Sequence, residues 1–226
     1  MSGLDEVVRK ILERRTDAPA AHSLLVGVSG IDGCGKGYLA AQLQAHLALH
    51  GVIPTILNVD GWLNLPQKRF DRDAPALNFY ENALRLDQFF SQLVLPLRER
   101  RSLRLVADFV EETASDYRPH TYDYRDVAVL LVEGIFLFKP QYRECFDLAI
   151  WVDCSFPTAL ARAIERAQEG LSPANTIAAY ETIYFPAQRI HLAQDRPREN
   201  ADIILENDCY RPPRALSLPA AAVFGR

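Results

Sequence analysis

The residues best placed to do chemistry form a glycine-rich segment near the N-terminus. It reads Gly-Ile-Asp-Gly-Cys-Gly-Lys over residues 30–36 and follows the apolar run 24–28. Closely spaced glycines allow a tight turn that brings backbone N–H groups to one anion, and a helix starting there adds a favourable dipole. Lys36 is long enough to reach the β- and γ-phosphates of a nucleotide. The segment predicts a phosphate-binding loop; the alternative is a plain strand-to-helix turn with a surface lysine.

The predicted nucleotide contacts are the residues of this loop and of the turn after it: Gly30, Asp32, Gly33, Cys34, Gly35, Lys36, Gly37 and Tyr38. In most loops of this kind the lysine is followed by Ser or Thr, whose hydroxyl binds Mg²⁺. Here the next residue is Gly37, so a metal loses that ligand, replaces it with water, or takes more of its ligands from carboxylates. The sequence thus predicts nucleotide binding together with an altered metal site.

Apolar strands alternate with helical patterns along the chain, and this alternation positions the loop. The expected strands are 24–29, 52–59, 127–132, 148–152 and 201–205, with a separate strand pair in 103–124. Helices are expected at 36–49, around 86–97, from Ser155 and from Ser172, and Pro186 is expected to break or kink the last one. The pattern predicts an α/β fold of the three-layer P-loop NTPase kind, a mainly parallel sheet with helices on both faces.

Length and composition favour one domain. The chain has 226 residues, and 49% of them are apolar, which is enough for a substantial core. We expect residues 1–226 to form a single domain with a short N-terminal helix at 3–15. A lid is expected at 168–174 and a loosely packed tail at 211–226.

Charge and cysteine content restrict the kinds of ligand and the cellular compartment that we expect for the protein. A net charge of −4 implies no basic surface, which argues against nucleic acid as the main ligand. No apolar run approaches the roughly 18 residues of a membrane span, and the charged N-terminus does not resemble a signal peptide. The 4 cysteines lack a paired CxxC spacing, which is typical of reduced thiols. We therefore expect a cytoplasmic protein that acts on a small molecule, without nucleic acid or membrane as partner.

Two carboxylates follow predicted strands. Asp60 comes after the strand 52–59, and Glu133 ends the apolar strand 127–132. The carboxyl ends of parallel strands share one edge of a sheet, where ligands collect. Asp60 is therefore a candidate base for an attacking hydroxyl and a candidate metal ligand, with a turn-forming Asp before Gly as the alternative. Glu133 is a candidate Mg²⁺ ligand, because an acid closing so apolar a strand needs a partner.

Other polar and aromatic residues are weaker candidates. Arg162 and Arg166 share one helix face and are predicted to clamp a transferring phosphoryl group, unless they form a solvated face with neighbouring glutamates. The residues predicted to line the acceptor pocket are Asp60, Trp62, Arg69, Phe79, Tyr80 and Asp108. At several of these positions the alternative is a side chain that packs in the core or lies on a surface loop without contacting a ligand.

In their order and context these segments resemble the uridine kinase, phosphoribulokinase and pantothenate kinase group of P-loop kinases, uridine kinase most closely. The resemblance covers residues from about 24 to 207. Besides the loop, the segments that carry it are Val59-Asp60-Gly61, Asn78-Phe79, Asp108-Phe109-Val110 and Leu131-Val132-Glu133-Gly134. The resemblance implies ATP- and Mg²⁺-dependent phosphorylation of a small-molecule hydroxyl, and a homo-oligomer. It puts Asp60 at the catalytic base, Glu133 at the metal carboxylate, and Arg162 and Arg166 beside the lid.

The chain departs from uridine kinases on the acceptor side. Tyr80 replaces the aspartate that holds the ribose hydroxyls, and Glu112 lies where a histidine is used for the pyrimidine ring. A polar site loses discrimination when its hydrogen-bonding groups are absent, so the acceptor is expected to differ from uridine. Two alternatives stay open: a pantothenate- or sugar-type kinase, and a nucleotide-binding module or slow NTPase that acts through a protein partner.

Overall fold

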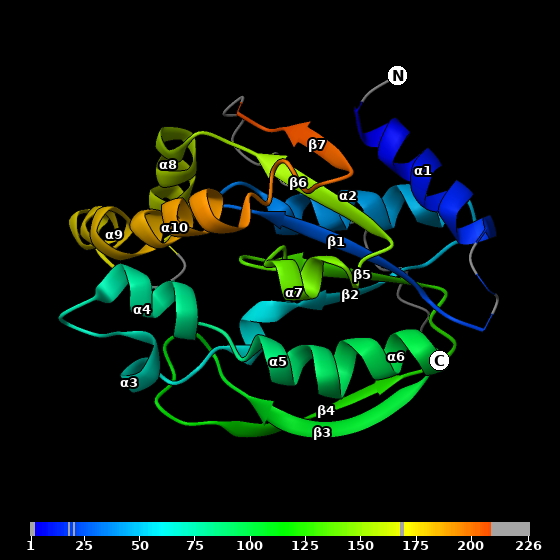
Figure 1. The fold of residues 1–226 in the computed structure, drawn as a ribbon, viewed down its shortest axis with the longest axis horizontal. Coiled ribbons are helices and arrows are strands. Elements are labelled where there is room, and N and C mark those ends of the chain that lie inside the picture. The colour runs from blue at the N-terminus through cyan, green and yellow to red at the C-terminus, as the bar shows by residue number, and fades with distance from the viewer. Residues whose placement is uncertain (1–2, 18, 20, 168–169, 209–226) are drawn as a thin grey trace, which may run out of the picture.

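The structure, a computed structural model, describes residues 3–17, 19, 21–167 and 170–208 (Figure 1). Its main sheet has five strands in the order β2-β5-β1-β6-β7, and every neighbouring pair is parallel. The central strands are buried along their whole length, as their apolar sequences predict. The strands are β1 (Leu24–Gly30), β2 (Thr55–Asn58), β5 (Val129–Gly134), β6 (Leu148–Asp153) and β7 (Ile203–Glu206).

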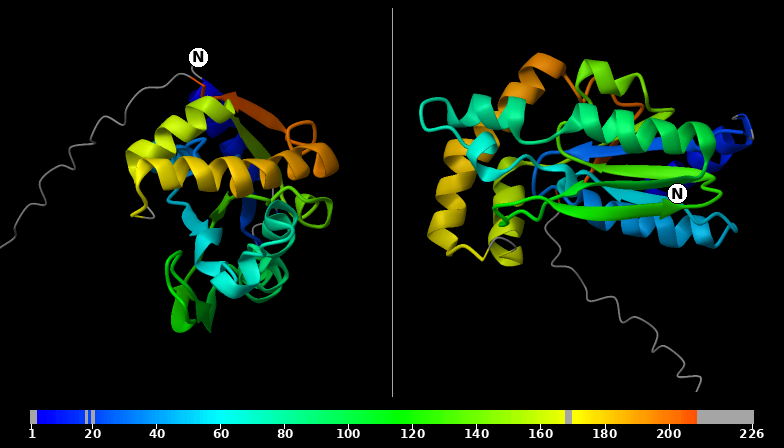
Figure 2. Two further views of the ribbon diagram at one scale, coloured as in Figure 1. Left: turned by 90° about the vertical axis from the view of Figure 1, so that its left-hand side faces the viewer. Right: turned by 90° about the horizontal axis from the view of Figure 1, so that it is seen from below.

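Helices cover both faces of this sheet and confirm the three-layer α/β arrangement. Figure 2 shows α2 on one side of the strands and α6 on the other. The first helices are α1 (Gly3–Asp17), α2 (Lys36–Ala48), α3 (Pro66–Arg69), α4 (Pro75–Asn82), α5 (Leu86–Gln88) and α6 (Leu95–Arg100). The later ones are α7 (Pro140–Arg143), α8 (Phe156–Arg166), α9 (Pro173–Ala179) and α10 (Phe185–Asp195).

The predicted strand pair in 103–124 is confirmed as a hairpin outside the main sheet. It comprises β3 (Leu103–Phe109) and β4 (Arg118–Tyr124), which run antiparallel. Its end meets the chain that follows β2, because the N–H of Val110 donates to the carbonyl of Gly61 at 3.3 Å. A Cβ on Gly61 would lie 2.5 Å from the Phe109 ring, so this contact requires glycine.

Two features of the fold differ from the expectations. The second strand is shorter than predicted, and Val59–Trp62 forms a 3₁₀ turn, η1, that carries Asp60. At Pro186 the helix neither stops nor breaks. Instead a π-helical turn, η3 (Tyr180–Tyr184), joins α9 to α10. A proline lacks the N–H and crowds the preceding turn, and the wider π turn accommodates both effects. The same arrangement, η2 (Phe89–Val94), precedes Pro96.

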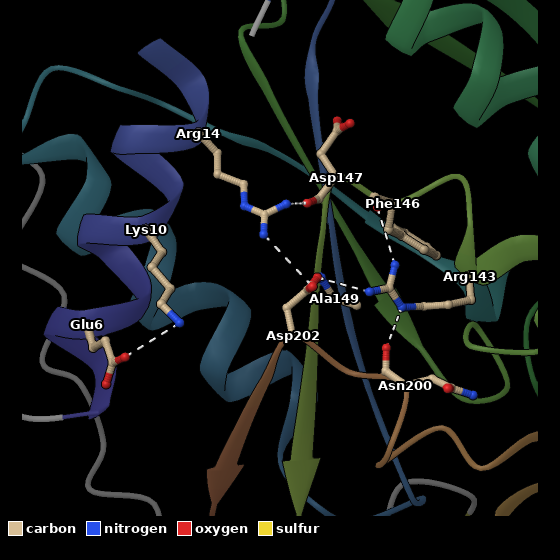
Figure 3. A network of polar contacts seen from close by, with 9 residues as sticks. All are labelled: Glu6, Lys10, Arg14, Arg143, Phe146, Asp147, Ala149, Asn200 and Asp202. Atoms are coloured by element: carbon tan, nitrogen blue, oxygen red, sulfur yellow. Dashed lines mark hydrogen bonds and ion pairs between the residues drawn. The ribbon is translucent and has the colours of Figure 1, made fainter. Parts of the chain in front are cut away.

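Charged residues tie the N-terminal helix to the edge of the sheet at which β6 and β7 begin (Figure 3). Arg14 on α1 donates to the backbone oxygen of Asp147 and lies 3.9 Å from the carboxylate of Asp202. Asp202 also accepts from Arg143 at 3.0 Å and from the backbone N–H of Ala149 at 2.7 Å. These contacts fix the amino-terminal edge of the sheet, opposite the edge that carries the phosphate-binding loop.

Some expectations concern the ends of the chain and the lid. The helix expected at 3–15 corresponds to α1. The tail expected at 211–226, and residues 168–169 of the expected lid, lie outside the described residues. Within the described part of the chain, no helix is both long and apolar enough to cross a membrane.

Candidate active site

The glycine-rich segment forms a tight loop between β1 and α2. Gly33 and Gly35 adopt φ values of +76° and +98°, which residues with a side chain rarely adopt. A Cβ on Gly33 would lie 2.5 Å from the Ala159 carbonyl, and one on Gly35 would lie 2.7 Å from the Asn207 amide. The glycines are therefore required both by backbone conformation and by close packing against α8 and the end of β7.

Lys36 begins α2 and turns back over the loop. Its Nζ donates to the carbonyl oxygen of Ile31 at 2.9 Å, and the residue is only 8% exposed. Burial by itself lowers the pKa of Lys36, but nearby groups, with Cys34 and Asp32 first, outweigh it and raise the pKa. The lysine therefore keeps its positive charge at the place where nucleotide phosphates are expected.

The other predicted loop residues divide into buried and exposed positions. Cys34 is fully buried, and its thiol would lie 2.6 Å from a Cβ on Gly30. Asp32 is partly exposed and accepts the N–H of Gly33 at 2.9 Å. Tyr38 is 57% exposed on the first turn of α2. Direct nucleotide contacts by these side chains remain predictions.

Glu133 lies beside Lys36 at the carboxyl edge of the sheet. Asn58 and Glu133 are register partners in the parallel pair β2–β5, and the Asn58 Nδ2 donates to the Glu133 Oε1 at 2.6 Å. Glu133 is 7% exposed. Burial raises its pKa to about 7, with the positive charge of Lys36 opposing this effect and Asp60 adding to it. A cation bound next to Glu133 would favour the ionised form of this carboxyl group.

Asp60 lies in η1 at the same edge. Its backbone N–H donates to the Oδ1 of Asn58 at 2.6 Å, and the residue is exposed to solvent. The protein that surrounds the carboxyl raises its pKa, while Lys36 and Asn58 lower it in part. A carboxylate with a raised pKa that still meets solvent is suited to accept a proton from a hydroxyl.

Replacing Glu133 by Gln is expected to raise the free energy of unfolding above about pH 7, measured without metal or nucleotide. The folded-state pKa of about 7 exceeds the ordinary 4.5, so ionisation of Glu133 destabilises the fold increasingly as the pH rises between these values. Gln keeps an acceptor for Asn58 and removes the charge. We expect a gain of about 1–3 kcal/mol near pH 8 and a smaller gain near pH 5, by urea denaturation. An equal effect at both pH values would contradict this account.

The surroundings of Gly37 allow a test of whether Mg²⁺ fits here. A Cβ on Gly37 would lie 3.6 Å from the Glu133 Oε1, so the carboxylate adjoins the place of the usual hydroxyl. Among the described residues, no group of three His, Cys, Asp or Glu side chains could hold a metal by itself. Mg²⁺ typically binds one or two carboxylates together with water and nucleotide phosphates. Glu133 and Asp60 therefore fit an ion that binds together with the nucleotide.

Replacing Gly37 by Ser is expected to lower the Mg²⁺ concentration needed for half-maximal nucleotide binding. The spacing of 3.6 Å is an ordinary contact, so there is room for the Cβ of a serine, and its hydroxyl would be added close to Glu133. We expect a change of about 3–10-fold, since one added oxygen ligand supplements an incomplete set. Gly37→Ala is the matched control, because it adds the Cβ without the hydroxyl. If the Ser and Ala variants behave alike, the metal does not lie beside residue 37.

The two predicted clamp arginines both reach the loop from α8. Arg162 donates to the backbone oxygen of Cys34 at 3.1 Å and to that of Asn207 at 2.8 Å. Arg166 lies 3.9 Å from the Asp32 carboxylate and is half exposed. Arg162 thus supports the loop backbone, and Arg166 stands nearer the solvent side. Contact with a transferring phosphoryl group remains a prediction for both.

Two of the predicted acceptor residues are rings that lie in the core. Trp62 is 1% exposed, with ring centroids 5.6 Å from Phe89 and 5.9 Å from Tyr122. Phe79 is also buried and packs against Tyr184, 4.9 Å away. Both rings pack against other rings inside the protein, and contact of either one with an acceptor remains a prediction.

The polar acceptor candidates have partners within the protein. Arg69 is 3% exposed and donates to the backbone oxygen of Glu112 at 2.7 Å, which ties α3 to the hairpin. Tyr80 donates to the Asp195 carboxylate at 2.7 Å. Asp108 is exposed on β3 and borders a surface hollow of about 400 Å³, which Lys68 also lines. Asp108 is the one of these three that the structure leaves facing solvent.

Sequence reasoning missed three polar residues that shape the site. Asn58 contacts both carboxylate residues, Tyr180 donates to the Asp32 Oδ2 at 2.6 Å, and Asn207 donates to the Cys34 carbonyl at 2.7 Å. An Asn two residues before an Asp is a signal for a side-chain-capped turn, so Asn58 had a local signature. Tyr180 and Asn207 reach the loop only through the tertiary fold.

Comparison with known proteins supports the fold assignment. No family model matches the chain. A candidate uridine kinase from Bacillus stearothermophilus superposes with a TM-score of 0.70 at 21% identity, covering 90% of this chain and 97% of that one. A candidate fructose transport system kinase from Silicibacter sp. TM1040 gives 0.68 at 21%, covering 89% and 98%. The D-glycerate 3-kinase of Cryptococcus neoformans gives 0.59 at 12%, covering 82% and 87%. The chain therefore has the three-layer α/β fold of P-loop kinases, uridine kinase-like proteins among them, as the sequence predicted.

Proposed function

We propose that the protein is an ATP- and Mg²⁺-dependent kinase that phosphorylates a hydroxyl group of a small molecule. The observation that carries this proposal is the grouping of Lys36, Asp60 and Glu133 at one edge of the sheet, around a phosphate-binding loop. Phosphoryl transfer needs positioning and charge stabilisation more than covalent chemistry, and this grouping supplies both. We further propose a cytoplasmic homo-oligomer as its setting.

The residues divide the work of the reaction. The loop N–H groups and Lys36 hold the β- and γ-phosphates, and Glu133 holds Mg²⁺ directly or through water. Mg²⁺ held there would supply positive charge that neutralises the phosphates. Asp60 orients the acceptor hydroxyl and takes its proton as the new O–P bond forms and the bond to ADP breaks. Arg162 and Arg166 stabilise the charge that develops on the phosphoryl oxygens.

The acceptor is proposed to be a small molecule other than uridine. Tyr80, where a ribose-binding aspartate would be, is bound to Asp195 and directed into the protein. The similar structures carry names that refer to uridine, to a fructose transport system and to D-glycerate, and one fold commonly hosts several substrates. A sugar- or pantothenate-type hydroxyl is therefore the class to test first.

A panel of acceptors tests this function. ADP release from ATP and Mg²⁺ is measured with nucleosides, sugars, sugar acids, glycerate and pantothenate added one at a time. Stimulation by one class identifies the acceptor and supports the kinase. Slow release that no compound changes would favour the rival function, a nucleotide-binding module or NTPase that acts through a protein partner.

A further inference from the structure

We propose that Asn58 is a positioning residue that sets the two carboxylates of the site, and with them the affinity for the metal–nucleotide complex. The inference rests on the proposed function, since it concerns the groups assigned to metal and proton transfer. Asn58 is the last residue of β2 and the residue that caps η1. Its side chain is the one group that hydrogen-bonds to both Glu133 and Asp60 among the described residues.

The chemistry of the two contacts fixes the orientation of the Asn58 amide. Its Oδ1 accepts the backbone N–H of Asp60 at 2.6 Å, and its Nδ2 donates to the Glu133 Oε1 at 2.6 Å. Turning the amide over would place N–H against N–H and oxygen against carboxylate, so only one orientation satisfies both partners. Both polar atoms of the Asn58 amide are therefore used in hydrogen bonds to residues of the site.

The sheet register places these groups together. Asn58 and Glu133 are opposite each other in the parallel pair β2–β5. Asn58 is exposed whereas Glu133 is buried, so the hydrogen bond joins a solvent-accessible residue to a buried carboxylate. The oxygen that accepts from Asn58 is also the one 3.6 Å from the Cβ position of Gly37. Asn58 thus aims Glu133 at the place where a loop hydroxyl would otherwise bind the metal.

This role matters here because residue 37 supplies no ligand. Groups that hydrogen-bond to a metal ligand fix its orientation, and their loss typically reduces metal affinity or activity about 10–100-fold. With glycine at 37, the direction of the Glu133 side chain carries more of the binding. Asn58 offsets the missing hydroxyl by holding that direction and, through the N–H of Asp60, by fixing the start of η1 as well.

Two variants separate the contacts. Asn58→Thr keeps an acceptor for the Asp60 N–H, since Thr caps such turns well, but removes the amide nitrogen that donates to Glu133 and leaves only a shorter hydroxyl. Asn58→Ala loses both. Gln44→Ala is the matched control, because Gln44 is an amide that donates to the same chain segment at Pro54, at 3.2 Å, before β2 begins. Thermal unfolding of each variant checks that it folds.

The readout is the factor by which Mg²⁺ tightens binding of a non-hydrolysable imido analogue of ATP, measured by calorimetry with Mg²⁺ and with EDTA. We expect this factor to be about tenfold smaller in both Asn58 variants than in the wild-type protein. The affinity measured in EDTA should not change in these variants, and the Gln44→Ala variant should have the wild-type factor. Glu133→Gln should lose the same amount, and adding Asn58→Thr to it should change nothing further.

Three results would overturn the proposal: a full Mg²⁺ effect in Asn58→Thr, losses that multiply in the double variant, or a wild-type protein that binds the analogue equally well with and without Mg²⁺. None of these results depends on an acceptor. The kinase proposal is therefore tested independently, by the measurement of ADP release with the panel of acceptors. Failure of the wild-type protein to bind the analogue at all would overturn both.

Discussion

Asp60→Asn is expected to lower acceptor-dependent turnover by about 10²–10⁴-fold while leaving nucleotide affinity nearly unchanged. The Asn side chain has almost the same size, and the cap between Asp60 N–H and Asn58 uses the backbone, so the turn is kept. What is lost is the carboxylate that takes the proton from the acceptor hydroxyl. Steady-state rates together with nucleotide titrations measure the two effects separately.

The control for this variant is Asp123→Asn, which removes a carboxylate from the hairpin strand β4, where it pairs with Arg125. Its rate should stay at the wild-type level. Normal turnover in Asp60→Asn would rule out the base assignment. Equal losses of rate and nucleotide affinity would instead point to a role in binding.

Lys36→Met is expected to weaken nucleotide binding and to lower turnover by about 10²–10³-fold. Lys36 is buried beside Glu133, and its positive charge keeps the pKa of that carboxyl from rising further. Methionine matches the length of the stem without the charge, so it removes the contact to phosphate and leaves the nearby carboxylates uncompensated. Nucleotide titration and rate measurements on the same preparation should show both losses.

Lys10→Met on α1 is a suitable control, since Lys10 is a partly exposed lysine that pairs with Glu6 and lies outside the site. Circular dichroism separates a binding defect from unfolding in either variant. Unchanged nucleotide affinity in Lys36→Met would refute the phosphate-binding role of the loop and with it the basis of the proposed function.

The main sheet and the loop could be predicted from sequence because their signals are local. Continuous apolar runs mark the buried strands β1 and β5, and the glycines at 33 and 35 mark a backbone that only glycine adopts readily. Asp60 and Glu133 could be placed together because parallel strands end at one edge. That inference needs strand positions but no tertiary detail.

The rest of the site depends on contacts between distant segments. Tyr180 lies 148 residues from Asp32, and Arg162 lies 128 residues from Cys34, so neither contact has a sequence signature. An aromatic ring after a strand is equally suited to stack on a ligand or to fill the core, and the tertiary fold places Trp62 in the core. The acceptor pocket is for this reason the part of the site for which the sequence carries the weakest signal.

The helix after residue 172 shows how a local rule can be right in its physics even though the chain does not break where the rule allows a break. Pro186 does remove a helical hydrogen bond, as expected, but the chain absorbs the defect in a π turn and continues to Asp195. The helix beyond Pro186 carries Asp195, which accepts a hydrogen bond from Tyr80, whereas Tyr180, before the proline, donates to Asp32.

Transfer of the γ-phosphoryl group itself is the most direct test of the central claim. ATP whose γ-phosphoryl group is labelled with heavy oxygen is incubated with the protein, Mg²⁺ and a mixture of small hydroxyl compounds, and the products are resolved by mass spectrometry. The account predicts that the label appears in a phosphomonoester of one compound and that this product is missing with Asp60→Asn. Label found only in inorganic phosphate, at the same rate in both proteins, would contradict it.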